Sequence, residues 1–313
     1  MKIVITGAIG HIGSRVIREL PLIFPGAEII MIDNMMTQRY SSLFNLSDKV
    51  KYRFFEDDVT KMDLKPVIER ADAVLHLAAI TDAAGSFDKK EELERNNFQA
   101  TKRVADVCCS VGSPMIHLSS TSVYGTQEEV VDEDCSLEEL QPQSPYAETK
   151  LREEDYLKEL GKTSGLRFTI CRFGTISGIS PGMRFHTAVN KFCWQAIMGQ
   201  PITVWKTALH QKRPYLALDD AIRAFCHIIK NSIFDNRVYN VLTDNLTVND
   251  IVNSISEKIP NVTIKFVETE IMNQLSYDVS NERFKATGFK FEGCVKKNIA
   301  ETVERLKNAN NLN

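Results

Sequence analysis

Three side chains that can donate, accept or hydrogen-bond a proton lie near the middle of the sequence: Ser120, Tyr146 and Lys150. Tyr146 and Lys150 are four residues apart in the segment PYAETK, and on a helix such residues share a face. An ammonium group there lowers the pKa of the phenol, which can then accept a proton from a substrate hydroxyl. Ser120, in LSSTSVYG, can hydrogen-bond the same oxygen. Because Tyr–x–x–x–Lys pairs also arise by chance on exposed helices, the surrounding sequence decides the interpretation.

The glycine-rich segment TGAIGHIG lies close to the N-terminus, directly after an apolar run. Its glycines are Gly7, Gly10 and Gly13, and His11 and Ile12 lie between them. At a turn from strand to helix, glycines let the backbone approach a pyrophosphate, and the helix N-terminus supplies N–H donors. The spacing is GxxGxxG rather than the commoner GxGxxG. The segment predicts a dinucleotide site.

Carboxylates and small residues follow the next strands. Asp33, followed by Asn34, ends the second strand and can accept hydrogen bonds from both hydroxyls of an adenosine ribose. It would repel a 2′-phosphate, so we predict NAD rather than NADP as cofactor. Asp58 ends the third strand and can accept from the adenine amino group, although a solvated acidic turn is the alternative for this residue. The remaining residues predicted to contact the cofactor are Val59, Leu77, Ala78 and Ala79.

Strand-like runs alternate with helical patterns through the first half of the chain. The predicted strands are Lys2–Gly7, Glu28–Asp33, Lys51–Asp58, Ala73–Ala79, Pro114–Ser120 and Arg167–Phe173. The main predicted helices are His11–Leu20, Asp88–Val111 and Pro145–Thr163. Nearly continuous apolar strands joined by helices indicate an α/β fold of the Rossmann type, a doubly wound parallel sheet covered on both faces.

The pattern changes after Phe173. A loop over 174–182 precedes a predicted helix, Arg184–Met198, and a short strand, Ile202–Trp205. Helices are expected over Asp219–Lys230, from an N-cap at Thr247, and over Val295–Leu306, with strands at Arg237–Val241 and Val262–Val267. We therefore predict an NAD-binding domain over 1–173, completed by about 213–243. A smaller α/β substrate lobe would comprise 174–212 and 244–313.

Composition narrows the function. The net charge is −3 across 313 residues, with lysine and arginine spread along the chain, so neither nucleic acid nor a membrane surface is an expected partner. No apolar run approaches the roughly 20 residues of a membrane helix, and the N-terminus lacks the pattern of a signal peptide. The seven cysteines are scattered without a CxxC pair. We expect a cytoplasmic protein without a disulfide framework or a metal site.

Together these motifs make the chain resemble the extended short-chain dehydrogenase/reductases, in particular the NAD-dependent nucleotide-sugar epimerase/dehydratase family. The resemblance runs from Lys2 to at least Leu246 and rests on TGAIGHIG, IDN, DDVT, HLAA, NNFQAT, SSTSVYG, YAETK, RFGTISGISPG and RPYLALDDA. It implies that Asn97 supports the active-site helix and proton relay, and that Arg213 binds the substrate diphosphate. It also implies a homodimer built from the Asp88–Val111 and Pro145–Thr163 helices.

Departures from the family pattern refine the predicted reaction. The 4,6-dehydratases carry an Asp–Glu pair where this chain has Thr121 and Ser122, and related decarboxylases and 3,5-epimerases carry Glu or Cys at the position of Ser122. The family usually has Asn in place of Thr175, and an arginine before Ser276-Tyr277, where Glu270–Leu275 contains none. Diphosphate binding would then fall to Arg213 and Arg184. His186 is a candidate for the sugar pocket, with a structural role as its alternative.

These features predict an NAD-dependent 4-epimerase of a nucleotide-diphosphate sugar, which oxidises C4 transiently. Tyr146 would be the base, Lys150 would tune it, and Ser120 would orient the oxygen. One alternative is a nucleotide-sugar C4-dehydrogenase or dehydratase, which would release an oxidised or dehydrated product. The non-enzymatic alternative is an NAD-sensing binding protein, whose expected mark is the loss of one of these three residues, and all three are present.

Overall fold

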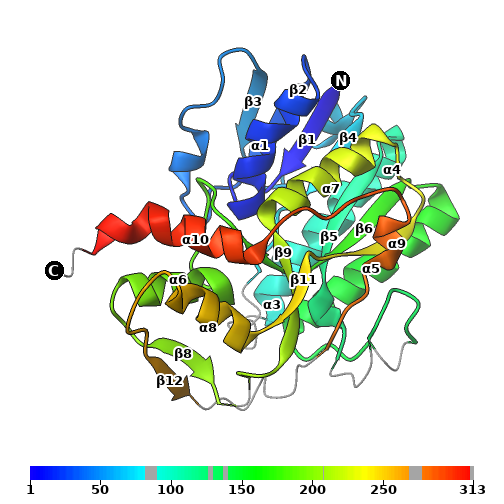
Figure 1. The fold of residues 1–313 in the computed structure, drawn as a ribbon. Coiled ribbons are helices and arrows are strands. Elements are labelled where there is room, and N and C mark those ends of the chain that lie inside the picture. Colours follow the sequence, from blue (N-terminus) through cyan, green and yellow to red (C-terminus); the bar gives the residue numbers. More distant parts are fainter. Residues whose placement is uncertain (82–89, 126–129, 137–139, 207, 268–276, 311–313) are drawn as a thin grey trace.

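A parallel sheet of seven strands forms the centre of the computed structural model, which describes residues 1–81, 90–125, 130–136, 140–206, 208–267 and 277–310 (Figure 1). The strand order is β10-β6-β5-β4-β1-β2-β3, and every neighbouring pair is parallel. The strands are β1 (Lys2–Thr6), β2 (Glu28–Asp33), β3 (Lys51–Glu56), β4 (Ala73–His76), β5 (Met115–Ser120), β6 (Phe168–Phe173) and β10 (Arg237–Val241). The predicted fold class and the return of Arg237–Val241 to the main sheet are confirmed.

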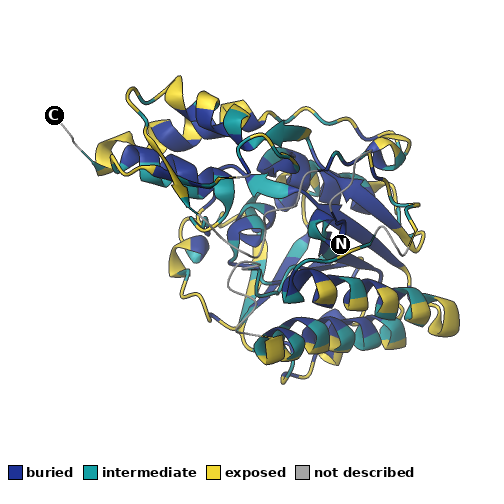
Figure 2. Ribbon diagram, turned by 90° about the horizontal axis from the view of Figure 1, so that it is seen from below, coloured by how far each residue is buried: buried dark blue, intermediate teal, exposed yellow. Residues whose placement is uncertain are grey.

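Helices cover both faces of this sheet because successive residues of each strand point to opposite sides. Ile3 and Ile5 of β1 face α1 (His11–Ile23) and α7 (Leu218–Lys230), whereas Val4 faces the other layer. That second layer contains α2 (Lys65–Ile68), α4 (Gln99–Val111) and α5 (Pro145–Ser164). Figure 2 shows buried strands between helices whose outer faces are exposed. This arrangement requires apolar residues on both faces of the strands, and the nearly continuous apolar strand sequences supply them.

A second, smaller assembly packs beside the carboxyl ends of the sheet strands. Its core is formed by α6 (Ala188–Ile197), α8 (Val248–Ser256) and α10 (Val295–Leu306) together with β8 (Ile202–Trp205). β8 pairs in parallel with β12 (Ile264–Val267). A three-stranded sheet contains β7 (Thr175–Ser177), β9 (Lys212–Ala217) and β11 (Asp244–Thr247), in the order β11-β9-β7. The remaining short helices are η1 (Tyr40–Leu43), α3 (Lys90–Leu93), η3 (Glu94–Phe98), η4 (Thr121–Val123), α9 (Glu282–Lys285) and η5 (Lys307–Ala309).

Several predicted boundaries need correction. The helix expected from Arg184 begins only at Ala188, because the preceding segment is held in another conformation: Asn190 donates a hydrogen bond to the Arg184 carbonyl, and the Phe185 ring packs on Trp194. The predicted loop after Phe173 contains β7. The expected helix over 88–111 is divided into α3, the π-helical turn η3 and α4, and its first two residues lie outside the described residues.

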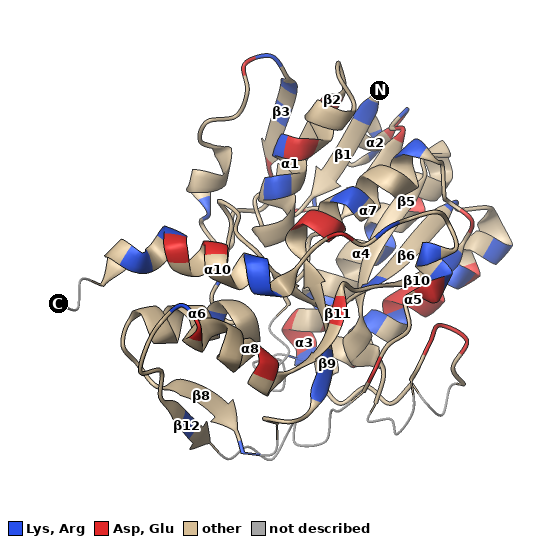
Figure 3. Cartoon of the chain, viewed as in Figure 1, with Lys and Arg blue, Asp and Glu red and all other residues tan. Residues whose placement is uncertain are grey.

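Other local predictions hold. The Thr247 hydroxyl accepts a hydrogen bond from the Asp250 backbone N–H, and the Asp250 carboxylate accepts one from the Thr247 N–H, which completes a capping box at α8. Lys and Arg residues are interspersed with Asp and Glu residues along the ribbon in Figure 3. Across the described ranges, no helix combines the length and apolarity required to cross a bilayer.

Candidate active site

A cleft of about 520 Å³ lies at the carboxyl ends of the central strands and extends to the smaller assembly. This edge of a parallel sheet is where α/β folds bind ligands. All but one of the site residues predicted from the sequence line the cleft; Asn97 is the exception. The lining set comprises Gly7, Gly10, His11, Ile12, Gly13, Asp33, Asn34, Asp58, Val59, Leu77, Ala78, Ala79, Ser120, Thr121, Ser122, Tyr146, Lys150, Thr175, Arg184, His186 and Arg213.

The glycine turn leaves no room for side chains. Gly7 adopts a φ of 66°, and a Cβ atom there would lie 2.6 Å from the Ala78 backbone nitrogen. A Cβ at Gly13 would lie 2.4 Å from the Gly7 carbonyl oxygen. Among the described residues, no side chain caps the N-terminus of α1, which therefore presents backbone N–H groups and the positive end of its dipole to the cleft. This cradle fits the pyrophosphate of a dinucleotide.

Asp33 ends β2 where an adenosine ribose would lie in such a site. Its carboxylate accepts hydrogen bonds from the backbone N–H groups of Ile9 (3.3 Å) and Met35 (3.0 Å). Burial raises the pKa of Asp33, and these hydrogen bonds together with the Arg39 guanidinium oppose that rise. Asp58 lies next to Asn34; although burial acts upward, hydrogen bonds from Thr60 and Asn34 lower the pKa of Asp58. The residues present fit the adenosine half of NAD.

His11 closes the base of the cleft rather than offering a charge to it. Its side chain is buried, and Nε2 lies 2.8 Å from the Gly178 carbonyl oxygen. Burial lowers the pKa of His11 to about 4, so the ring is neutral at pH 7 and donates its Nε2–H to that carbonyl. His11 therefore ties the glycine turn to the loop after β7.

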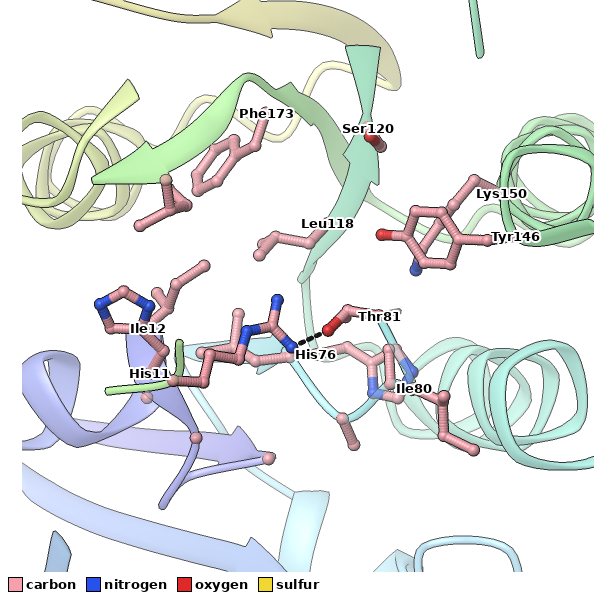
Figure 4. Close-up of a pocket in the computed structure, with 18 of the residues that line it drawn as sticks. His11, Ile12, His76, Ile80, Thr81, Leu118, Ser120, Tyr146, Lys150 and Phe173 are labelled. Atoms are coloured by element: carbon pink, nitrogen blue, oxygen red, sulfur yellow. Dashed lines mark hydrogen bonds between the residues drawn. The ribbon is translucent and has the colours of Figure 1, made fainter. Parts of the chain in front are cut away.

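Tyr146, Lys150 and Ser120 meet at the centre of the cleft. Pro145 begins α5 after the Ser144 N-cap, so Tyr146 and Lys150 lie on one face of consecutive turns. Figure 4 shows both side chains projecting toward the strand that carries Ser120, with His11 and Ile12 on the far side of the cleft. The Lys150 Nζ lies 5.8 Å from the centre of the Tyr146 ring. The Ser120 Oγ accepts a hydrogen bond from the Ser122 hydroxyl at 2.9 Å.

Several opposing contributions set the pKa of Tyr146, whereas the sequence pointed only to the lowering by Lys150. Burial raises the pKa of the Tyr146 phenol; the Lys150 ammonium lowers it, Glu153 raises it, and the Arg184 guanidinium lowers it. The lowering expected from Lys150 is present, but burial outweighs it. The pKa of Lys150 is itself raised: burial alone would lower it, but the Glu153 carboxylate and the Tyr146 phenol act more strongly in the opposite direction.

Asn97 lies beneath the cleft. It is fully buried in the π-helical turn η3, a feature often found at functional sites. Its Oδ1 accepts a hydrogen bond from the Ile80 N–H, and its Nδ2 donates one to the Ile80 carbonyl, both at 2.8 Å. Asn97 thus fixes the chain that leaves β4 next to the cleft.

The part of the cleft predicted to hold the substrate is lined by polar and cationic groups from several elements. Thr121 is buried and donates a hydrogen bond to the Phe173 carbonyl at 3.2 Å. Arg184, in the loop before α6, hydrogen-bonds Thr81, an interaction drawn dashed in Figure 4. Arg213 on β9 lies over the Trp205 ring, 5.7 Å from its centre. His186 lines the cleft from the same loop as Arg184 and is otherwise exposed, so neither residue stands on the predicted helix.

Sequence reasoning missed other lining residues, among them Arg39, Thr81, Glu92, Asn96 and Tyr277. Most lie in or beside connecting segments, where periodicity carries no signal. Asn96 is the first residue of the NNFQAT motif, so the family resemblance pointed to its stretch of chain, whereas Glu92 lies on α3 before the motif. Among the described residues, no group of three or more His, Cys, Asp or Glu side chains is placed to hold a metal ion.

The doubly wound sheet, the glycine cradle and the Ser–Tyr–Lys cluster define a dinucleotide-binding α/β protein of the extended Rossmann type. A family model described as "NAD dependent epimerase/dehydratase family" matches residues 3–241. The chain belongs to that family, as the motifs predicted.

Relatives with known names differ in their reactions. The chain is 28% identical to the "trifunctional UDP-glucose 4,6-dehydratase/UDP-4-keto-6-deoxy-D-glucose 3,5-epimerase/UDP-4-keto-L-rhamnose-reductase" of Arabidopsis thaliana, over 97% of this chain and 46% of that protein. It is 29% identical to the "Uncharacterized UDP-glucose epimerase YtcB" of Bacillus subtilis, over 73% of this chain and 72% of that one. The chain thus spans about half the length of the multifunctional relatives.

Solved structures share the fold over the whole chain. The UDP-glucuronic acid 4-epimerase of Bacillus cereus, solved with UDP-glucuronic acid and NAD, superposes with a TM-score of 0.87 at 23% identity, covering 98% of this chain and 100% of that one. The UDP-N-acetylglucosamine 4-epimerase of Methanobrevibacter ruminantium gives 0.85 at 22% identity, covering 99% of each. At this level of identity the similarity establishes the fold alone.

Proposed function

We propose that the protein is an NAD-dependent nucleotide-sugar 4-epimerase. The observation that carries this proposal is the meeting of Ser120, Tyr146 and Lys150 in one cleft with the glycine cradle. Thr121 and Ser122 line the same cleft, and neither can act as the carboxyl acid or base that water elimination requires. The names of the 4-epimerases that share the fold are further support.

The chain's own residues would divide the work as follows. NAD, held by the glycine turn and Asp33, supplies a reversible hydride acceptor. Tyr146, as the phenolate, takes the proton of the C4 hydroxyl and later returns it to the same oxygen. Ser120 donates a hydrogen bond to that oxygen, and Lys150 stabilises the phenolate through its charge. Inversion requires that the 4-keto sugar turn over in the cleft, so that the hydride would return to the opposite face of C4 while the oxygen regains its proton from Tyr146.

The nucleotide end would be held by cations. Arg213 and Arg184 both line the cleft, and guanidinium groups can grip phosphate oxygens in a bidentate manner. Relatives and structural neighbours named for UDP-sugars favour UDP as the nucleotide.

A C4-dehydrogenase or dehydratase is the second candidate, because the Arabidopsis relative and several others are named as 4,6-dehydratases. Thr121 and Ser122 stand against the dehydratase, because neither side chain has a pKa suited to acid–base elimination of water, but they do not bear on the dehydrogenase. An NAD-sensing binding protein is disfavoured by the intact Ser120, Tyr146 and Lys150.

Product analysis separates these functions. The purified protein would be incubated with UDP-, dTDP-, GDP- and CDP-linked sugars, and the products followed by mass spectrometry and NMR. Epimerisation leaves the mass unchanged and inverts one centre; oxidation and water loss change the mass. A C4 epimer that forms with the wild type and not with Tyr146→Phe supports the proposal. A mass change, or no turnover of any sugar, contradicts it.

We further propose a cytoplasmic homodimer in which α4 and α5 of each protomer form an isologous four-helix interface. These helices pack on each other and cover one face of the central sheet. The division into an NAD-binding domain and a substrate lobe is also a proposal, supported by the separate core that α6, α8 and α10 form. Light scattering at micromolar concentration should give twice the mass of the chain.

A further inference from the structure

A buried carboxylate lies directly behind the Tyr146–Lys150 pair. Glu153, one turn along α5 from Lys150, is fully buried. Its Oε2 lies 2.8 Å from the Lys150 Nζ and 3.0 Å from the His117 Nε2 on β5. The His117 ring stacks on His76 of β4, with ring centres 6.0 Å apart. A row of ionisable side chains therefore runs behind the cleft wall, from Lys150 through the buried Glu153 and His117 to His76, which also lines the cleft.

The carboxyl group of Glu153 is fully buried, so its negative charge requires compensation inside the protein. An ionised carboxylate without water is strongly unfavourable unless a charge or hydrogen bonds compensate it. Within the described part of the chain, the Glu153 Oε1 has no hydrogen-bond partner, so both close polar contacts are made by Oε2. Lys150 is its only cationic contact there, and we infer that this ammonium keeps Glu153 ionised.

The neighbouring charges leave Glu153 as the counter-ion of Lys150. Glu154, the next residue, is also buried, but it pairs with Arg172 of β6 at 2.7 Å and with Lys158 at 3.4 Å. His76 is neutral at pH 7, because burial lowers its pKa to about 3, and its ring is held by the hydroxyls of Thr6 and Thr101. Burial likewise lowers the pKa of His117.

On the cleft side, Arg184 from the loop before α6 is the remaining charged group that acts on the Tyr146 phenol. The groups facing the pair are thus Glu153 and Glu154 from α5, His117 from β5, His76 from β4 and Arg184. Of these, Glu153 is the anion in contact with Lys150.

We propose that Glu153 is a positioning residue for the proposed epimerase reaction: it holds the Lys150 ammonium beside Tyr146 and sets the pH range in which the phenolate forms. The proposal rests on the proposed function only for its catalytic consequence. Its electrostatic part concerns the phenol and the ammonium, whatever the substrate is.

Removal of the negative charge of Glu153 should lower the pKa values of both Tyr146 and Lys150. Without Glu153, the phenol of Tyr146 loses a proton more easily, and so does the ammonium of Lys150. The acidic limb of the pH profile reports the first and the alkaline limb the second, so both limbs move to lower pH. A residue that only packs the helix would lower the rate without moving either limb.

The test uses the NAD-bound protein and the variants Glu153→Gln and Glu153→Asp. The phenol is titrated by its tyrosinate absorbance, taken as the difference from Tyr146→Phe, and the pH dependence of kcat/KM is measured with the best sugar substrate. We expect Glu153→Gln to move the phenol titration down by roughly half to one pH unit. Glu153→Asp, which keeps the charge and withdraws it by one methylene group, should move it in the same direction by less.

Glu148→Gln is the matched control, because Glu148 lies on the same helix but is exposed and pairs with Lys90 at 3.5 Å. Its titration and profile should match the wild type. If Glu153→Gln does not fold, the Glu153→Asp titration decides. Unmoved or raised titrations in the folded Glu153 variants overturn the proposal. A lowered titration in a protein that turns over no sugar supports the role of Glu153 and overturns the proposed function instead.

Discussion

Replacement of Arg213 by alanine tests the substrate end of the cleft directly. Arg213 is half-buried on β9 and lines the cleft, and its Nε atom is buried. Among the described residues, no carboxylate forms an ion pair with it, and its one recorded hydrogen bond is a long contact of 3.4 Å with the Gln211 side chain. Its guanidinium therefore lacks a carboxylate partner among the described residues and can meet an anion in the cleft, and its removal also loses the contact with the Trp205 ring.

The magnitude follows from the kind of contact. A charge-assisted hydrogen bond contributes about 1.5–3 kcal/mol, so the loss of a guanidinium–phosphate contact should weaken binding by roughly 10- to 100-fold. Isothermal titration of Arg213→Ala with a nucleoside diphosphate should show this loss, and the Michaelis constant should rise with it. NAD affinity should stay unchanged, because the glycine cradle and Asp33 lie at the other end of the cleft.

Two further variants sharpen the test. Arg213→Lys keeps the charge but loses the fork, so it should recover part of the lost affinity. Arg237→Ala removes an exposed arginine of β10 that does not line the cleft, and it should bind the nucleoside diphosphate as the wild type does. Unchanged affinity in Arg213→Ala would refute the placement of the diphosphate beside β9.

Three other predictions follow from the site and the core. Tyr146→Phe should lose turnover by several orders of magnitude while it binds NAD normally, and activity within a few-fold of wild type would remove the assigned base. The protein should bind NAD at least about tenfold more tightly than NADP, and Asp33→Ser should narrow that gap because the Arg39 guanidinium remains nearby; calorimetry reads both. The pKa of His76 is lowered to about 3 by burial, so below pH 6.5 the unfolded chain takes up a proton that the native protein excludes. The free energy of unfolding should therefore fall by about 2 kcal/mol between pH 7 and pH 5 for each histidine buried in this way. Denaturant unfolding should show a smaller fall in His76→Gln than in the wild type. The control variant His210→Gln, at an exposed position, should show the same fall as the wild type.

The cofactor half of the site could be predicted from the sequence because each of its residues follows a strand. Gly7 directly follows β1, Asp33 is the last residue of β2, and Ala78 lies two residues beyond β4. Parallel strands bring their carboxyl ends to one edge of the sheet. Strand periodicity and the glycine spacing were therefore sufficient to place them together. The same argument placed Ser120, since it is the last residue of β5.

The substrate half depends on contacts that periodicity does not encode. The sequence pattern of 184–198 is compatible with one continuous helix. The segment that carries Arg184 and His186 is instead held by the Asn190 side chain and by the tilted packing of the Phe185 ring against Trp194. These contacts arise only after α6 has packed on the smaller core. Asn97 shows the same limit: the family motif singled it out, but only the structure shows that it binds the Ile80 backbone and lies outside the cleft.

Two pairs of adjacent, chemically identical residues, one on β5 and one on α5, have different partners in the structure. Ser119 and Ser120 both line the cleft, but the Ser119 hydroxyl donates a hydrogen bond to the buried Glu154 carboxylate at 2.6 Å. Glu154 neutralises Arg172 deep in the sheet, while Glu153 contacts Lys150 at the site. Helical spacing alone brings both glutamates near Lys150, three and four residues away, and cannot tell which one will contact it. The choice is made by Arg172 on β6, which engages the Glu154 carboxylate in two hydrogen bonds and leaves Glu153 to Lys150.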